Sequence, residues 1–163
     1  MPLVYADTSA LFAYFHPRDE FTRPVAAVVR VQSPDFVWWA LLKFELRHNL
    51  RLARTDAHGE AAWRALRVAE GTATRLRYRP ELQAQSVLEA ADDLSADKGN
   101  QAPCGIADVW HVAAARRVHA LKELDEFWTC DEGQFALAKV CGLPARLFKR
   151  PAPAAARPGS DPS

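Results

Sequence analysis

Short strand-like runs alternate with helical stretches along the chain, and this alternation limits the fold more than any other feature. The runs expected to form strands are residues 3–6, 36–39, 75–79, 124–129 and 145–148. The stretches expected to be helical are residues 10–15, 20–31, 41–53, 57–73, 81–96, 106–119 and 132–140. Strands separated by helices imply parallel pairing through right-handed crossovers. We therefore predict an α/β fold, a three-layer α/β/α sandwich with a mainly parallel sheet of four to five strands.

Length and composition indicate one folded domain and a tail. The 163 residues suit a single core, with 49% apolar and 25% charged residues, which is the balance of an ordinary soluble protein. We assign residues 1–149 to the domain and predict that residues 150–163, rich in Pro and Ala, are disordered. The start of the chain lacks the basic segment of a signal peptide, and no apolar run is long enough to span a membrane.

The cysteines point to a reducing compartment. Cys104, Cys130 and Cys141 are odd in number and widely spaced, which fits neither a disulfide framework nor a zinc site. We expect reduced thiols and a cytoplasmic protein, with no membrane partner.

Four acidic residues fall where a parallel sheet would gather them. Asp7 follows the first predicted strand and Asp131 follows the fourth, so both should lie at the carboxyl edge of the sheet, where open parallel sheets bind ligands. Glu45 and Asp108 lie inside apolar helical stretches, where an unpaired charge is costly. Each lies early in its predicted helix, and we expect each to point toward the same crevice.

Carboxylates held this close need a counter-ion. Two of them 4 Å apart repel by roughly 4 kcal/mol at an effective dielectric constant of about 20. Mg²⁺ or Mn²⁺ prefers oxygen ligands and removes that repulsion, and it also activates water and orients a phosphodiester. Thr8, Ser9 and Thr129 could add hydroxyl contacts to the metal-bound waters. The pattern favours a metal-dependent phosphodiesterase.

Each acid also has an ordinary structural interpretation. Asp7 and Asp131 could simply cap the helices that follow them, and Glu45 could pair with Lys43 or Arg47 on a solvated face. The nearby polar residues His48, Asn49 and His111 are more often structural than ligands.

Charge is divided unevenly along the chain. Residues 43–79 hold nine Lys or Arg and four acids, whereas residues 81–108 hold six acids and one Lys. A basic face near an acidic pocket suits a polyanion bound by its backbone. Arg47, Arg51 and Arg54 are the residues that we expect to contact the phosphates of a nucleic acid, although arginines on amphipathic helices are usually just solvated.

Four segments together resemble the PIN domain, and their order most resembles its bacterial VapC-type toxins. The segments are Tyr5-Ala6-Asp7-Thr8-Ser9-Ala10-Leu11, Phe44-Glu45-Leu46, the run from Ile106 to Ala115 around Asp108, and Trp128-Thr129-Cys130-Asp131 with the residues to Ala138. The resemblance covers residues 1 to about 149. One departure is Trp38-Trp39, where the family commonly has small or hydroxyl residues.

The resemblance implies a Mg²⁺- or Mn²⁺-dependent endoribonuclease that leaves 5′-phosphate and 3′-hydroxyl ends. Asp7, Glu45 and Asp108 would be the main catalytic and metal-binding acids and Asp131 the fourth, with Ser9 in a supporting position. It further implies the toxin of a type II toxin–antitoxin pair, with RNA, including tRNA, as substrate, a cognate antitoxin as inhibitor, and a homodimer.

Three other interpretations were weighed. A haloacid-dehalogenase phosphatase would carry a second aspartate two residues after Asp7, where Ser9 stands instead. A receiver domain would need paired acids after the first strand and a lysine after the last, and neither is present. The remaining alternative is a catalytically silent PIN-like module that binds RNA or protein.

Overall fold

The structure is a computed structural model that describes residues 1–99 and 101–151. Five strands are present in this part of the chain: β1 (Leu3–Ala6), β2 (Asp35–Trp38), β3 (Leu76–Tyr78), β4 (Glu126–Thr129) and β5 (Ala145–Leu147). Seven helices accompany them: α1 (Thr8–Phe15), α2 (Thr22–Gln32), α3 (Ala40–Leu52), α4 (Ala57–Thr72), α5 (Ala84–Lys98), α6 (Ile106–Ala120) and α7 (Glu132–Val140).

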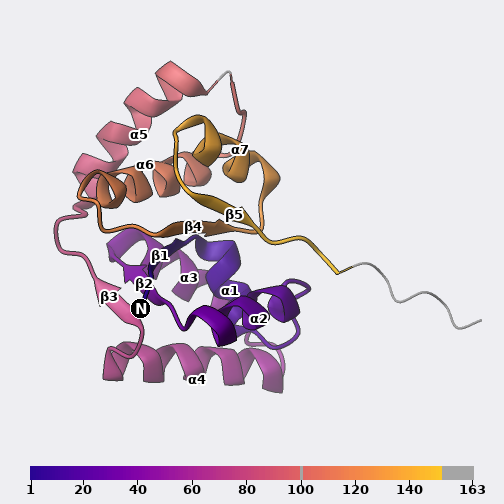
Figure 1. Cartoon of the computed structure of the whole chain (residues 1–163). Helices are drawn as coiled ribbons and strands as arrows, with labels where there is room; N and C mark the ends of the chain where they lie inside the picture. Colours follow the sequence, from indigo (N-terminus) through magenta and orange to yellow (C-terminus); the bar gives the residue numbers. More distant parts are fainter. Residues whose placement is uncertain (100, 152–163) are drawn as a thin grey trace, which may run out of the picture.

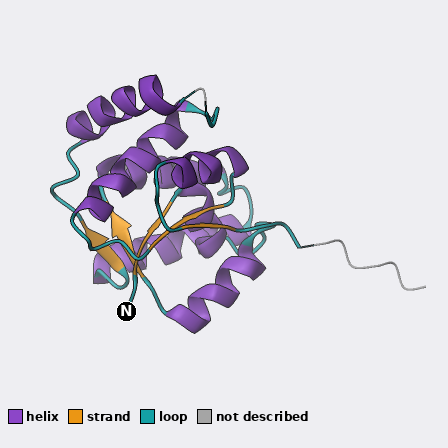
Figure 2. Ribbon diagram, turned by 45° about the horizontal axis from the view of Figure 1, so that its top comes forward, coloured by secondary structure: helices purple, strands orange, loops and turns teal. Residues whose placement is uncertain are grey.

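The strands form one sheet in the order β3-β2-β1-β4-β5, and every pair is parallel (Figure 2). The central strand is β1, in which Val4 is in register with Phe36 on one side and with Glu126 on the other. Because β1 lies between β2 and β4, the residues that follow β1 and β4 emerge side by side. The predicted α/β class is confirmed, and the sheet has five parallel strands.

Helices cover the sheet in two groups. Figure 1 shows α4 on one side of the sheet and α5, α6 and α7 on the other. Helix α1 packs against α2, α3 and α4, whereas α6 packs against α5 and α7. This arrangement is consistent with a three-layer α/β/α fold.

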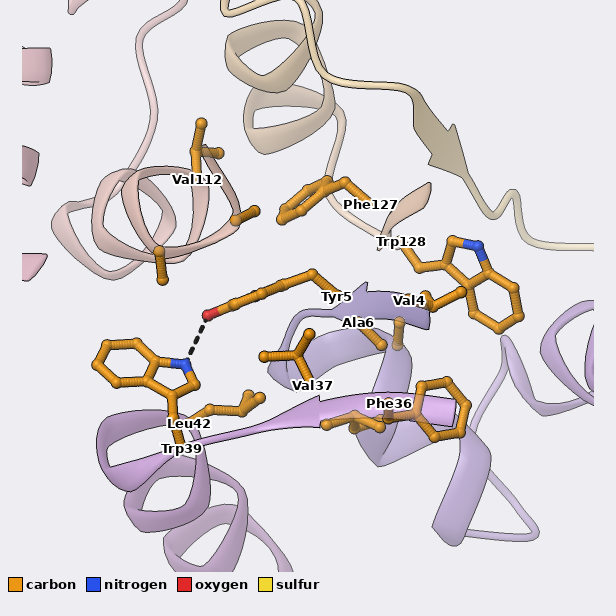
Figure 3. Packing of buried hydrophobic residues seen from close by; sticks show 14 of the residues in the cluster. Val4, Tyr5, Ala6, Phe36, Val37, Trp39, Leu42, Val112, Phe127 and Trp128 are labelled. Carbon is orange, nitrogen blue, oxygen red and sulfur yellow. Dashed lines mark hydrogen bonds between the residues drawn. The ribbon is translucent and has the colours of Figure 1, made fainter. Parts of the chain in front are cut away.

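Large aromatic side chains fill the core next to the central strands (Figure 3). Tyr5, Phe36, Trp39, Phe127 and Trp128 are all buried. The ring of Tyr5 stacks on that of Phe127, with centroids 5.7 Å apart. Burying side chains of this size supplies much of the hydrophobic stabilisation of a small domain.

Four helices begin at residues other than those predicted: α1, α2 and α5 by two or three residues and α3 by one. The first helix was predicted from residue 10, but α1 already begins at Thr8, and Asp7 caps it by accepting the N–H of Ala10 at 2.8 Å. Helix α5 begins at Ala84, three residues later than predicted. A turn precedes it, in which Leu82 donates to the Arg79 carbonyl and buries its side chain.

The remaining predictions about organisation concern the tail and membranes. Of the predicted disordered segment 150–163, the structure describes only Arg150, which pairs with Glu20 at 2.6 Å, and Pro151; residues 152–163 lie outside the described residues. None of the described helices is both long and apolar enough to cross a membrane.

Candidate active site

All four predicted acids line one cleft of about 610 Å³ at the carboxyl edge of the sheet. Asp7 directly follows β1, and Asp131 comes two residues after β4. Glu45 projects from α3, and Asp108 from the first turn of α6. The cleft is completed by Thr8, Ser9, Phe12, Asp19, Phe21, Asn49, Leu52, Ala53 and His111. Five carboxyl groups thus share a cleft whose lining includes neither Lys nor Arg.

Asp7 is the most deeply held of the acids, with only 3% of its surface exposed. Its oxygens accept from the Ser9 hydroxyl at 2.7 and 2.9 Å, from the Ala10 N–H at 2.8 Å and from the Thr129 hydroxyl at 2.8 Å. Burial raises the pKa of Asp7, although these donors and His111 act in the opposite direction. Ser9 and Thr129, predicted as supporting residues, therefore orient Asp7.

The same two hydroxyls connect β1 to the segment after β4. The Ser9 hydroxyl accepts the N–H of Cys130 at 2.9 Å, and the Thr129 hydroxyl accepts the N–H of Asp131 at 2.9 Å. Asp131 then caps α7 by accepting the N–H of Gln134 at 2.7 Å. The capping roles that we weighed for Asp7 and Asp131 both occur, and both residues line the cleft as well.

Glu45 is held by a buried histidine and by Thr8. One of its oxygens, Oε2, lies 2.9 Å from His111 Nε2 and accepts the Thr8 hydroxyl at 2.6 Å. Burial of Glu45 opposes ionisation, but the hydrogen bond and charge of His111 outweigh it and lower the pKa of Glu45. Glu45 is thereby kept ionised, and its partner is His111 rather than the Lys43 or Arg47 of the ordinary interpretation.

When His111 carries a single ring proton, a chain of buried hydrogen bonds determines which nitrogen holds it. The Trp39 indole can only donate, and it donates to the Tyr5 hydroxyl at 2.9 Å, a contact drawn in Figure 3. The Tyr5 hydroxyl lies 3.0 Å from His111 Nδ1, so it can donate a hydrogen bond to that nitrogen. Nδ1 is then the acceptor, and Nε2–H faces Glu45. The chain links Trp39, Tyr5, His111 and Glu45 in sequence.

Asp108 lies in the first turn of α6. Its Oδ2 accepts the Gly105 N–H at 2.8 Å, and its Oδ1 accepts the Gln134 amide at 3.2 Å. Burial and the nearby Asp131 and Glu45 raise the pKa of Asp108, and they outweigh the Gly105 bond and His111. Gln134 is fully buried, and its Oε1 has no hydrogen-bond partner among the described residues.

The donor set suits a hard cation, but the carboxylates are not yet gathered around one point. Five acids with no Lys or Arg among the lining residues supply the oxygen ligands that Mg²⁺ and Mn²⁺ prefer. Within residues 1–99 and 101–151, however, no three His, Cys, Asp or Glu groups are arranged closely enough to hold an ion. Mg²⁺ commonly keeps several water ligands and binds through only one or two carboxylates, so it does not need three side chains at one point.

The predicted RNA-binding arginines have protein partners outside the cleft. Arg47 makes a two-point ion pair with Glu70, at 2.9 and 2.7 Å. Arg54 pairs with Glu60 at 2.8 Å. The Arg51 guanidinium lies over the Trp63 ring, 5.2 Å from its centroid.

The cysteines are free thiols, as expected for a reducing compartment. Burial together with Asp108 and Asp131 raises the pKa of Cys104 to about 11. Burial and Asp7 raise the pKa of Cys130 to about 12, against a weaker effect of Ser9. Both thiols are therefore protonated near neutral pH, which makes them poor nucleophiles.

Sequence reasoning missed two residues and underrated a third. Asp19 reaches the cleft from the loop before α2, and no local pattern marks it. Gln134 lies three residues after Asp131, at the helix position whose N–H a capping residue binds, but no local pattern indicates that its side chain contacts Asp108. His111 was considered only as a weak candidate, yet it is the direct partner of Glu45.

Comparison with known proteins adds no assignment. The sequence matches no protein-family model, and no curated protein matches it significantly.

Proposed function

We propose that this protein is a metal-dependent endoribonuclease that hydrolyses RNA phosphodiester bonds. One observation carries the proposal: acids from four separate elements line a single cleft at the carboxyl edge of a parallel sheet, with no Lys or Arg in its lining. Structural ion pairs would bring Lys or Arg to such a cluster, whereas the basic residue here is His111, which pairs with Glu45. A cleft that concentrates carboxylates instead suits a divalent cation and, through it, a phosphate.

Asp7, Glu45, Asp108 and Asp131 are the residues that would hold Mg²⁺ or Mn²⁺. When bound, the ion would supply an activated water and neutralise the negative charge of the phosphodiester. The resemblance of the four sequence segments to the PIN domain supports the choice of RNA as substrate.

The protein's own residues prepare the cleft for this task. Ser9 and Thr129 fix both oxygens of Asp7, and His111 with Thr8 fixes one oxygen of Glu45. The second oxygen of Glu45 is left for a ligand. The buried Tyr5 and Trp39 hold the His111 ring in place, so that Glu45 is presented at a defined position.

The cellular role follows from the resemblance alone. By analogy with VapC-type toxins, the protein would be the toxin of a type II pair, active on RNA such as tRNA, inhibited by a cognate antitoxin and dimeric. A cytoplasmic location belongs to the same proposal.

A second candidate, a catalytically silent RNA- or protein-binding module, is favoured by one observation. Every one of the four acids already accepts a hydrogen bond from the protein, and no three ligand groups are assembled among the described residues. Such a cleft could persist without metal.

Cleavage of labelled total RNA by the purified protein separates the two candidates. We expect discrete cuts with Mg²⁺ or Mn²⁺ that disappear in EDTA and in the Asp108→Asn variant. Asp93→Asn, on α5 and outside the lining of the cleft, is the matched control and should cut like the wild type. A folded, antitoxin-free protein that leaves RNA intact under all metal conditions would favour the silent module. Equal cutting by Asp108→Asn would exclude the proposed site.

A further inference from the structure

A second hollow, of about 300 Å³, lies on the other flank of α3. It is lined by Ala40, Lys43, Phe44, Arg47, Arg51 and Tyr78. Two of these residues are large aromatics that point into solvent: Phe44 is 68% exposed and Tyr78 is 62% exposed. They come from different elements, since Phe44 lies on α3 and Tyr78 ends the edge strand β3. Exposing two aromatic rings at one place is costly for a protein without a ligand for them.

The charged residues that line this hollow are all basic. Lys43, Arg47 and Arg51 line the hollow, and no acid does. Arg47 is neutralised by Glu70, but Lys43 and Arg51 have no ion-pair partner in the described part of the chain. The position of Arg51 over Trp63 keeps its guanidinium in a defined place. The hollow therefore combines flat apolar surfaces with two uncompensated cations.

Helix α3 connects this hollow to the acid cleft. Phe44 and Arg51 line the hollow, whereas their neighbours in sequence, Glu45 and Leu52, line the cleft. Phe44, exposed His48 and exposed Leu52 lie four residues apart and form a strip along the outer face of the helix. A helix with its side chains is only about 10–12 Å wide. A ligand crossing this strip would therefore reach both sites.

We propose that the hollow is a stacking subsite for a base of single-stranded RNA whose backbone crosses α3 into the acid cleft. The inference rests on the proposed function for its choice of RNA. Single-stranded nucleic acids are bound by aromatic rings that stack on bases and by cations that follow the phosphates, and the hollow presents both. Duplex RNA keeps its bases stacked within the helix and offers no free face to Phe44 or Tyr78.

Binding of a fluorescent single-stranded oligoribonucleotide, measured by anisotropy in EDTA, tests the subsite without cleavage. We expect Phe44→Ala and Tyr78→Ala each to raise Kd about 10-fold, the order found when a stacking residue is removed. Phe44→Trp should retain affinity, and Phe44→Leu should lose it, because leucine keeps apolar surface but has no ring. Val31→Ala, at a residue that is 86% exposed on α2, is the matched control and should bind like the wild type. A duplex of the same sequence should bind more weakly and respond little to any of these changes.

The outcomes separate this inference from the proposed function. If the wild type cuts RNA but the Phe44 and Tyr78 variants keep its Kd and KM, the subsite is excluded and the nuclease stands. If the variants lose binding to RNA that the wild type never cuts with Mg²⁺ or Mn²⁺, the subsite stands and the nuclease fails. A third outcome is that Phe44→Ala binds RNA as the wild type does but forms a smaller assembly in solution. The hollow would then be a contact between copies of this chain, which would overturn the inference.

Discussion

The Tyr5 hydroxyl shows how one buried polar atom can support both stability and the cleft. It accepts from the Trp39 indole and lies within hydrogen-bond distance of His111, and all three side chains are buried. Because burial separates the hydroxyl from water, the pKa of Tyr5 is raised well above its ordinary value and the group stays neutral. A neutral hydroxyl can serve as donor and acceptor at once, which the network requires.

Removing that hydroxyl should be costly. Tyr5→Phe leaves the Trp39 N–H and His111 Nδ1 without partners, and an unsatisfied buried group costs about 1–3 kcal/mol. We expect the free energy of unfolding, measured with urea, to fall by roughly 2 kcal/mol or more.

Tyr14→Phe is the matched control. Within the described part of the chain the Tyr14 hydroxyl makes no hydrogen bond, so its removal should change the free energy of unfolding little. Combining Tyr5→Phe with Trp39→Phe should cost less than the sum of the two single changes. Full additivity would argue against a shared hydrogen bond.

Residue patterns predicted some of the site and could not predict the rest. Asp7 and Asp131 could be placed because each follows a strand, and the ends of parallel strands share one edge. The partners of His111 could not be placed, since Tyr5 and Glu45 lie 106 and 66 residues away in sequence. Asp19 depends on the path of a loop, which tertiary packing determines.

At the level of elements, the joint between α3 and α4 depends on a glycine. A Cβ atom at Gly59 would lie 1.8 Å from the Ala53 carbonyl oxygen, a backbone atom that cannot move away cheaply. At Gly71, in the same helix, a Cβ would meet no atom within 4 Å. A side chain at Gly59 would therefore clash with the backbone, whereas a side chain at Gly71 would have room.

Alanine substitution at the two positions should change stability in opposite directions. Gly71→Ala should stabilise the protein by about 0.5–1 kcal/mol, because glycine is the poorer helix former. Gly59→Ala should destabilise it by roughly 2 kcal/mol or more, because the helix junction must open. Thermal and urea unfolding of both variants checks this, and two changes of the same sign would show that the junction is more tolerant than its geometry implies.

The last two strands are linked by Glu126. Its carboxylate accepts from Arg146 at 3.0 and 2.7 Å and from the Trp128 indole at 2.6 Å. Burial of Glu126 opposes ionisation, but Arg146 and Trp128 outweigh it, so its pKa is lowered. A carboxyl group with a lowered folded-state pKa stabilises the protein above its unfolded-state pKa, and this contribution is lost as pH falls through the folded-state value.

Glu126→Gln should therefore weaken the protein at neutral pH and matter little in strong acid. The expected loss near pH 7 is roughly 0.5–1 kcal/mol, since the pair is partly exposed. Urea unfolding at neutral and at strongly acid pH, with the exposed Glu89→Gln on α5 as control, measures it. A difference that persists in strong acid would assign the effect to packing.

Element types were easier to predict than element ends. Apolar runs and helical periodicity located all twelve elements, because these patterns arise from local burial. The start of α5 was wrong because Leu82 is buried outside the helix, which only the packing of the preceding turn reveals. The sheet order also required contacts between segments distant in sequence.

For the molecule as a whole, a bound metal should appear as added stability. A ligand that binds only the folded state at 100 times its Kd stabilises by about 2.7 kcal/mol. For a domain of this size that corresponds to roughly 5–10 °C in Tm. We expect Mn²⁺ to raise the Tm of the wild type and of Asp93→Asn, and to raise it little or not at all in a variant combining Asp7→Asn with Asp108→Asn. Equal shifts in all three proteins would place metal binding outside the cleft.

The pairing of β1 with β4 has a consequence for synthesis of the protein. Asp7 is made among the first residues, yet one of its hydrogen-bond donors is Thr129, 122 residues later, and the cleft also needs Asp131. A ribosome must therefore release nearly the whole folded region from its exit tunnel before these groups can meet. A growing chain lacks Asp131 and one of the donors to Asp7, so whatever chemistry the cleft performs is withheld from the nascent polypeptide.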